Sequence, residues 1–318
     1  MKKIVALLLV AVMAIGLVAC KAAPAAGGGA ADDGVFKVAI VLAEYNEWNQ
    51  NYEKKVIEKC EAWGWEYQIF DAKQDANKQI DDVRSVINQG FDAMTIQAVD
   101  MAALAPVVEE AADAGVIVVD HYGFTEDQVP GEKIYQNLFD QKGAGKLQAE
   151  EFIKQSGITS GKVAIIAGLT GASNAMARTE GFMEVLNKYP GIEVVQTEYC
   201  DWDTQKAQTA AENILTAHPD LKAFLVADDG MSKGVWNAIE AANLQDSCKI
   251  ASQGFYEWSK EYIKSDKFMF TIAYPAGNFS IAAMDMIKNH VDGTAQERIS
   301  YVGMSLVTKE NCRTTDHD

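Results

Sequence analysis

The sequence predicts an α/β protein with two lobes, each containing a doubly wound parallel sheet. Apolar segments of strand length alternate with amphipathic segments of helix length from residue 36 onward, and the alternation begins a second time after residue 120. Alternating strands and helices form a parallel sheet with right-handed crossovers. Because 318 residues suffice for two domains of ordinary size, two such sets predict two lobes.

The first set consists of four strands separated by three helices. Gly64, Gly90 and Gly115 stand directly after the three helical segments, where glycine commonly ends a helix. The fourth strand is a β-branched apolar run, which is typical of a strand buried in a parallel sheet. We expect strands at residues 36–43, 65–70, 92–97 and 116–120, and helices at residues 47–63, 77–89 and 102–114.

Asp120 and His121 follow the apolar run of the fourth strand. Ligands of open α/β sheets bind beyond the carboxyl ends of the strands, so this pair lies where a site is expected. The alternative for Asp120 is that it only begins a turn.

The second set continues the same alternation almost to the C-terminus. We expect helices at residues 142–155, 173–188, 204–217, 231–242 and 279–291. We expect strands at residues 162–167, 192–198, 223–227, 249–253 and 268–273, and a terminal strand region at residues 299–307.

Residues 1–20 are predicted to be a lipoprotein signal peptide. Lys2 and Lys3 precede an apolar run that ends in Leu-Val-Ala-Cys and is too short for a comfortable membrane span. This ending resembles the bacterial lipobox, which implies lipidation of Cys20 and a membrane anchor. The alternative is an ordinary signal peptide in which Cys20 is incidental. Residues 21–34 are rich in Ala and Gly without periodicity, which predicts a flexible tether.

The formal charge of −17 argues against a nucleic-acid partner, because phosphate binding requires a basic face. Without Lys2 and Lys3, 26 basic residues remain against 45 acidic ones, a charge of −19. No zinc pattern surrounds the four histidines, and we expect neither a metal nor a cofactor. Export permits disulfides, so pairings and free thiols both remain open for Cys60, Cys200, Cys248 and Cys312.

Four stretches carry a resemblance to a known family: residues 168–182 (GLTGASNAMARTEGF), 214–220 (ILTAHPD), 226–234 (VADDGMSKG) and 271–274 (TIAY). Together with the order of the segments, they resemble the periplasmic sugar-binding proteins of the ribose-binding type, which supply ABC transporters. The likeness covers nearly all of residues 36–307. An export signal and the lack of a helix-turn-helix separate the chain from related repressors.

The resemblance implies the type I periplasmic binding protein fold, in which three hinge strands join two lobes. The chain would cross between the lobes near Phe139, Tyr274 and Met304. The N-terminal lobe would then comprise residues 35–138 plus 275–304, and the C-terminal lobe residues 139–274 plus 305–318.

The resemblance also implies ligand contacts in the first lobe. Residues 44–49 (EYNEWN) match the family's Asn-x-aromatic stretch, so Asn46 would bond a ligand hydroxyl and Trp48 would stack on a ring face. Trp48 is alternatively a helix-start or core aromatic residue. Asp120 matches a strand-end aspartate that accepts two hydroxyls, whereas His121 replaces the usual arginine and so puts ribose itself in doubt. The candidates in this lobe are Glu44, Tyr45, Asn46, Trp48, Gln97, Asp120 and His121.

In the second lobe, Arg178 falls on the family's arginine, and Trp202 on an aromatic residue flanked by two acids. The rings of Trp48 and Trp202 would then enclose a sugar from opposite lobes. Arg178 is alternatively a surface ion-pair residue, and Asp228 alternatively a helix cap. Residues 252–258 align with the family in two ways, one of which makes Gln253 a contact. The candidates in this lobe are Arg178, Trp202, Asp228, Gln253 and Tyr274.

The resemblance therefore implies an extracytoplasmic solute-binding receptor that captures a monosaccharide or polyol in an interlobe cleft and delivers it to an ABC importer. We expect a monomer whose partners are the small-molecule sugar or polyol, the ABC transporter permease and, through the lipid anchor, the membrane. A receptor for a cationic or amphipathic solute and a ligand-presenting sensory subunit remain alternatives. An enzyme is not expected, because Gly-x-Ser-x-Gly is missing and no Ser-His-acid set can be assembled.

Overall fold

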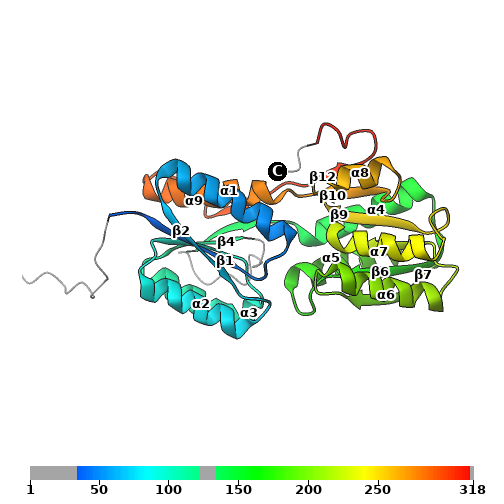
Figure 1. Cartoon of the computed structure of the whole chain (residues 1–318), viewed down its shortest axis with the longest axis horizontal. Helices are drawn as coiled ribbons and strands as arrows, with labels where there is room; N and C mark the ends of the chain where they lie inside the picture. Colours follow the sequence, from blue (N-terminus) through cyan, green and yellow to red (C-terminus); the bar gives the residue numbers. More distant parts are fainter. Residues whose placement is uncertain (1–33, 122–133, 316–318) are drawn as a thin grey trace, which may run out of the picture. The chain divides into compact units, whose positions relative to one another are not determined.

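The computed structural model describes residues 34–121 and 134–315, which form two six-stranded sheets flanked by helices (Figure 1). Two mostly parallel α/β lobes confirm the predicted fold class. The predicted signal peptide, Cys20 and all but the last residue of the predicted tether lie outside the described residues. Within those residues, no helix is long and apolar enough to cross a membrane.

The first sheet is parallel throughout and has the strand order β11-β5-β4-β3-β1-β2. Helices α1 and α9 pack together on one face, and α2 and α3 pack together on the other (Figure 1). The strands are β1 (Lys37–Leu42), β2 (Glu66–Asp71), β3 (Ala93–Ile96), β4 (Ile117–His121), β5 (Ile134–Leu138) and β11 (Ile299–Tyr301). The helices are α1 (Glu47–Trp63), α2 (Ala76–Gln89), α3 (Met101–Asp113) and α9 (Ala276–Val291).

The second sheet has the order β12-β10-β9-β8-β6-β7, and only β12 pairs in the antiparallel direction. Helix α4 packs on α5, and α6 on α7. The strands are β6 (Ser160–Ala167), β7 (Gly191–Tyr199), β8 (Ala223–Val226), β9 (Lys249–Gly254), β10 (Phe270–Ala273) and β12 (Ser305–Val307). The helices are α4 (Gln141–Ser156), α5 (Ser173–Leu186), α6 (Thr204–Ala217), α7 (Asp229–Ala241) and α8 (Ser259–Lys264).

The chain passes from one sheet to the other three times. It leaves the first sheet after β5 and enters α4, returns from β10 to α9, and crosses again between β11 and β12. Helix α9 belongs with the first sheet because it packs on β4 and β5. The residue bounds given above for the two lobes stay predictions.

Two elements were missed in the sequence, and one predicted region proves to be two strands. Strand β5 was missed because its buried residues include the polar Gln136 and Asn137, which interrupt the apolar run. Asn137 is satisfied by donating to the Phe279 carbonyl at 2.9 Å, a partner that sequence reading cannot supply. Helix α8 is too short to show a period. The terminal region divides because β11 joins the first sheet and β12 the second.

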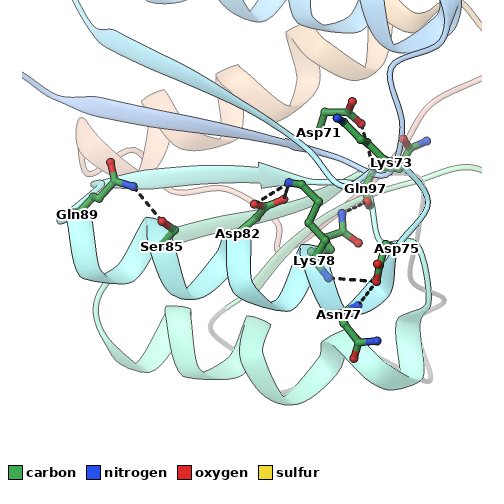
Figure 2. A network of polar contacts seen from close by, with 10 residues as sticks. Asp71, Lys73, Asp75, Asn77, Lys78, Asp82, Ser85, Gln89 and Gln97 are labelled. Carbon is green, nitrogen blue, oxygen red and sulfur yellow. Dashed lines mark hydrogen bonds and ion pairs between the residues drawn. The ribbon is translucent and has the colours of Figure 1, made fainter.

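Polar contacts along α2 hold the loop that carries Gln97 (Figure 2). Asp75 caps the helix by accepting from the backbone amides of Asn77 at 2.9 Å and Lys78 at 3.2 Å. From the same helix, buried Gln79 donates to the Gln97 carbonyl at 2.7 Å and accepts from the Val99 amide at 2.8 Å. The loop after β3 is therefore positioned by side chains as well as by the strand.

The four cysteines of the described residues, Cys60, Cys200, Cys248 and Cys312, are buried free thiols. Burial raises the pKa of Cys60, Cys200 and Cys248 to about 12. These thiols therefore remain protonated and pack as small apolar side chains.

Candidate ligand-binding site

A cavity lies at the carboxyl ends of strands from both sheets. Including its open mouth it measures about 320 Å³, at the small end of the range for ligand pockets. The residues that line it are Glu44, Asn46, Trp48, Gln97, Asn174, Arg178, Trp202, Asp228 and Tyr274. Eight of these nine are among the candidates expected from the sequence.

The loop between β1 and α1 places Glu44 and Asn46 in the cavity wall, and the first turn of α1 places Trp48 there. Asn46 caps α1 by accepting from the Asn49 amide at 2.9 Å, while its own amide donates to Glu44 Oε1 at 2.8 Å. The Asn49 side chain donates to the Glu44 carbonyl at 2.8 Å, so the loop is bonded at both ends. Trp48, only 6% exposed, meets the Phe279 ring edge-on at a centroid distance of 5.5 Å.

Glu44 is the acid of this loop, and only amide side chains donate to its carboxylate among the described residues. Asn46 donates to Oε1, and Gln74 Nε2 donates to Oε2. Burial raises the pKa of Glu44 to about 7, and the neighbouring acids Asp228 and Asp71 act in the same direction. Gln74 also donates to the Asp201 carbonyl at 3.1 Å, so the same amide reaches the turn that carries Trp202.

Arg178 comes from the first turns of α5 and is only 1% exposed. Its Nε donates to Gln141 Oε1 at 2.8 Å, and its Nη1 donates to Tyr274 Oη at 2.8 Å and to the Ala227 carbonyl. The guanidinium lies over the rings of Tyr274 and Trp202, at 4.7 and 5.5 Å from their centroids. The alternative of a surface ion pair is therefore wrong.

Trp202 lies in the turn after β7, where both it and Asp201 have positive φ angles of 59° and 52°. Its ring packs directly on the backbone of Gly168. A Cβ atom at residue 168 would lie 2.1 Å from the Trp202 ring, so only glycine allows this approach. Gly168 therefore allows the Trp202 ring to take its place beside the cavity.

Asp228 both caps a helix and faces the cavity. Its Oδ1 accepts from the Gly230 amide at 2.7 Å, and its Oδ2 accepts from Tyr256 Oη at 3.0 Å. Burial raises the pKa of Asp228 to about 6, although the Arg178 guanidinium acts in the opposite direction. Asp228 therefore caps α7 and lines the cavity, and its role as a ligand contact stays a prediction.

Asp229, fully buried behind Asp228, holds the loop after β9 in place. It accepts from Thr271 Oγ1 at 2.8 Å, from the Phe255 amide at 2.9 Å, and from the hydroxyls of Ser252 and Ser259. These bonds keep Phe255 at a φ of 85° and so bring Tyr256 to Asp228. The sequence reading missed both Asp229 and Tyr256.

Four candidates are not among the residues that line this cavity. Asp120, His121 and Gln253 are fully buried at strand ends, whereas Tyr45 is 49% exposed and donates to Glu53. The His121 ring stacks on Tyr52 at a centroid distance of 3.9 Å, and burial lowers the pKa of His121 to about 3. His121 is therefore a neutral member of an aromatic stack.

Asn174 lines the cavity but was missed in the sequence. It stands four residues before Arg178 in α5, and residues four apart share one face of a helix. The spacing of four residues from Arg178 could therefore have identified Asn174 from the sequence. Gln74 was missed as well, because its role depends on a turn 127 residues away.

A second cavity, of about 380 Å³ including its opening, adjoins the first. Glu44, Gln97, Asn174 and Trp202 line both, so the two are compartments of one cleft. Gln74 and Ser173 add further polar groups to the second compartment. The described residues contain no cluster of His, Cys, Asp and Glu able to hold a metal ion.

Comparison with known proteins identifies the family. Residues 38–295 match the family described as periplasmic binding protein domain. The D-ribose/D-allose-binding protein of Pseudomonas aeruginosa is 31% identical over 200 residues, which are 62% of this chain and 62% of that protein, less than two thirds of its length. The ribose import binding protein of Bacillus subtilis is 32% identical over 222 residues, 69% of this chain and 70% of that protein.

Solved structures share the fold. An ABC transporter solute binding protein from Mycobacterium smegmatis with bound glycerol has a TM-score of 0.80 and 26% identity, with 88% of this chain and 96% of that chain covered. A periplasmic solute binding protein from Actinobacillus succinogenes with bound D-allose has a TM-score of 0.79 and 23% identity, with 88% and 100% covered. At the latter identity, the likeness is one of fold alone.

Proposed function

This chain belongs to the periplasmic binding protein domain family, a family of binding proteins, and we propose that it is an extracytoplasmic receptor for a monosaccharide or polyol. One observation carries the proposal: Trp48 and Trp202, from the two lobes, line one cavity together with acids, amides and an arginine. Relatives named for binding ribose, allose and apiose support it. Delivery to an ABC importer is part of the proposal.

The lining suits a polyol because a sugar has apolar C–H faces and a rim of hydroxyls. The two indole rings would stack on the faces, since aromatic side chains combine large apolar area with defined geometry. Asn46, Gln97 and Asn174 would donate to and accept from the hydroxyls. Buried hydroxyls without partners are costly, so these amides would set which ring positions carry them.

Arg178 and Asp228 would bind neighbouring oxygens. The guanidinium presents donors in a planar fork, and the carboxylate accepts. Tyr274 would hold Arg178 in place through its hydroxyl. We propose these residues, with Glu44, as the ligand contacts.

We also propose Asp120, His121, Gln253 and Tyr45 as ligand contacts, although none of them lines the cavity. The first three are buried at strand ends, and Tyr45 is exposed beside Glu44. Among the described residues, neither amide atom of buried Gln253 has a hydrogen-bond partner, and neither do the ring nitrogens of His121. Buried polar atoms normally have partners, so a ligand or bound water would satisfy them.

Binding would act through closure of the two lobes. The chain crosses between the sheets three times, and both lobes supply groups to the cavity. A ligand that contacts both lobes has differential affinity for the closed state and shifts the population toward it.

Outside the described residues, lipidation at Cys20 would anchor the protein on the extracytoplasmic side of the membrane, and residues 21–34 would tether the lobes to that anchor. We propose that the mature protein acts as a monomer and docks on an ABC transporter permease. Replacing Cys20 by Ser should release the protein from the membrane fraction, as fractionation and immunoblotting would show. Retention of the Cys20→Ser protein in the membrane would contradict the anchor.

A thermal-shift screen of the mature chain, residues 21–318 with unfolding and refolding to remove co-purified ligand, tests the main proposal. The panel contains aldoses, ketoses, polyols, sugar acids and amines. A ligand at 100 times its Kd should stabilise the fold by about 2.7 kcal/mol, which raises the midpoint visibly. Hits among sugars or polyols that are lost in Trp202→Ala support the proposal. A panel without any sugar or polyol hit contradicts it.

A further inference from the structure

The two compartments of the cleft differ in charge. Arg178 and Asp228 line only the first compartment, where the guanidinium and the carboxylate offset each other. The second compartment is lined by Glu44 and by neutral polar groups from Gln74, Ser173 and Asn174, with no basic side chain among its described lining residues. A ligand reaching into the second compartment therefore meets one acid and no protein cation.

Glu44 lies where the compartments join, since it lines both. Its two carboxylate oxygens accept from the amides of Asn46 and Gln74. Across the part of the chain that the structure describes, no Lys, Arg or His forms an ion pair with it. The charged groups that act on Glu44 are Asp228 and Asp71, both acidic.

A partly buried carboxylate with only neutral donors and two acidic neighbours is under-compensated. Burying a charge is unfavourable unless an opposite charge pairs with it. The usual solution in a protein is a lysine or arginine, and within the described ranges no such side chain forms an ion pair with Glu44. The missing cation can come from the ligand.

We propose that the ligand is an amino sugar or aminopolyol whose ring occupies the first compartment and whose ammonium group binds Glu44 at the second. This inference rests on the proposed sugar or polyol function and narrows its substrate class. Arg178 does not oppose it, because the guanidinium lines only the first compartment and is committed to Gln141, Tyr274 and the Ala227 carbonyl. The two compartments adjoin, since Trp202 and Asn174 line each of them, so a ligand in the first lies next to the second.

The test is isothermal titration calorimetry of residues 21–318 with matched pairs: glucosamine and glucose, galactosamine and galactose, and an amino-inositol and its parent inositol. The N-acetyl sugars serve as neutral forms of similar shape. We expect at least one amine to bind about 10- to 100-fold more tightly than its parent, as one charged hydrogen bond supplies. The variant Glu44→Gln, which keeps the length and shape of the side chain but removes its charge, should reduce the ratio of amine affinity to parent affinity to about one.

The control variant is Glu47→Gln, which removes the same charge three residues away and outside both compartments. It should affect each amine and its parent equally. Unfolding midpoints of both variants near the wild-type value exclude a folding defect.

Each remaining outcome contradicts the inference. If a parent sugar or polyol binds as tightly as its amine and Glu44→Gln weakens both equally, the inference fails while the proposed function stands. If no amine, parent or N-acetyl form binds, and the wider sugar and polyol panel is also negative, the proposed function fails and the inference with it.

Discussion

The indole N–H of Trp258 donates to the Glu47 carboxylate at 2.7 Å, linking the loop after β9 in the second lobe to the first residue of α1 in the first. Trp258 stacks on Tyr256 with a centroid distance of 5.5 Å, and Tyr256 bonds Asp228 in the cavity. Gln74 makes a second link, to the Asp201 carbonyl. The two lobes are thus bonded to each other by groups adjacent to the ligand contacts.

Removing the hydrogen bond between Trp258 and Glu47 should lower the affinity for every ligand by the same factor. Trp258→Phe keeps a ring on Tyr256 but lacks the donor, so we expect affinity to fall about 3- to 10-fold, equivalent to a net hydrogen bond of about 0.5–1.5 kcal/mol. A double-mutant cycle with Glu47→Gln, measured by calorimetry, should return a coupling energy of that size. Strictly additive losses would show that the bond does not stabilise the closed state.

Gly168→Ala should reduce binding by displacing the Trp202 ring. The added Cβ would lie 2.1 Å from the ring, so the indole must move. We expect a stability loss of about 1–3 kcal/mol from overpacking, and a larger proportional loss of sugar affinity. The double variant Gly168→Ala/Trp202→Phe, with its smaller ring, should recover stability in a denaturant titration. An unchanged affinity in the single variant would remove Trp202 from the site.

Asp229→Asn should destabilise the second lobe. The carboxylate accepts from four donors, and an amide nitrogen in its place would face hydroxyls that now donate to it. We expect a loss of about 2–4 kcal/mol in the free energy of unfolding by urea. The exposed Asp246→Asn is the matched control and should change that energy by less than about 0.5 kcal/mol. Equal values for both variants would contradict the role given to Asp229.

The stability of the ligand-free protein should depend on pH through Glu44. Its pKa in the folded protein is raised from an ordinary value of 4.5 to about 7, because burial and the acids Asp228 and Asp71 disfavour the charged form. Ionisation therefore opposes folding: the contribution of Glu44 to stability is fully present below about pH 4.5 and is lost as pH rises toward 7. Asp228 and Asp229, whose pKa values are also raised, are both retained in Glu44→Gln, so the comparison isolates Glu44 together with its repulsion of Asp228.

As pH rises from about 4.5 to 7, the free energy of unfolding of the wild type should fall by on the order of 1–3 kcal/mol more than that of Glu44→Gln. Urea unfolding of both proteins at pH values between 4.5 and 8 measures the difference. Parallel curves would show that Glu44 is well solvated and not under-compensated.

Much of the fold followed from local patterns. Helices α1 and α6 begin and end at the predicted residues, since a 3.6-residue period, capping acids or amides and, for α1, a terminal glycine are all properties of short segments. Strand β5 was not predicted because Gln136 and Asn137 are polar residues that are buried with partners elsewhere in the fold. Burial of polar residues is a tertiary property, and the sequence carries no local sign of it.

The cavity shows the same division. Trp48, Arg178 and Asp228 could be named because the stretches that carry them resemble a known family. By contrast, the contacts of Gln74 with Asp201 and of Glu47 with Trp258 join residues 127 and 211 positions apart. Such pairs depend on how the two sheets meet.

The sequence by itself determined the two α/β lobes and the order of most elements, because hydrophobic period is a local property of each segment, and the family resemblance named most of the residues at the cavity. Only the tertiary structure decided the surroundings of each side chain. Arg178 is buried and committed to partners, His121 is neutral in an aromatic stack, and among the described residues Glu44 accepts from two amides and forms no ion pair. Charge compensation depends on distances between segments remote in sequence, and those distances exist only in the folded chain.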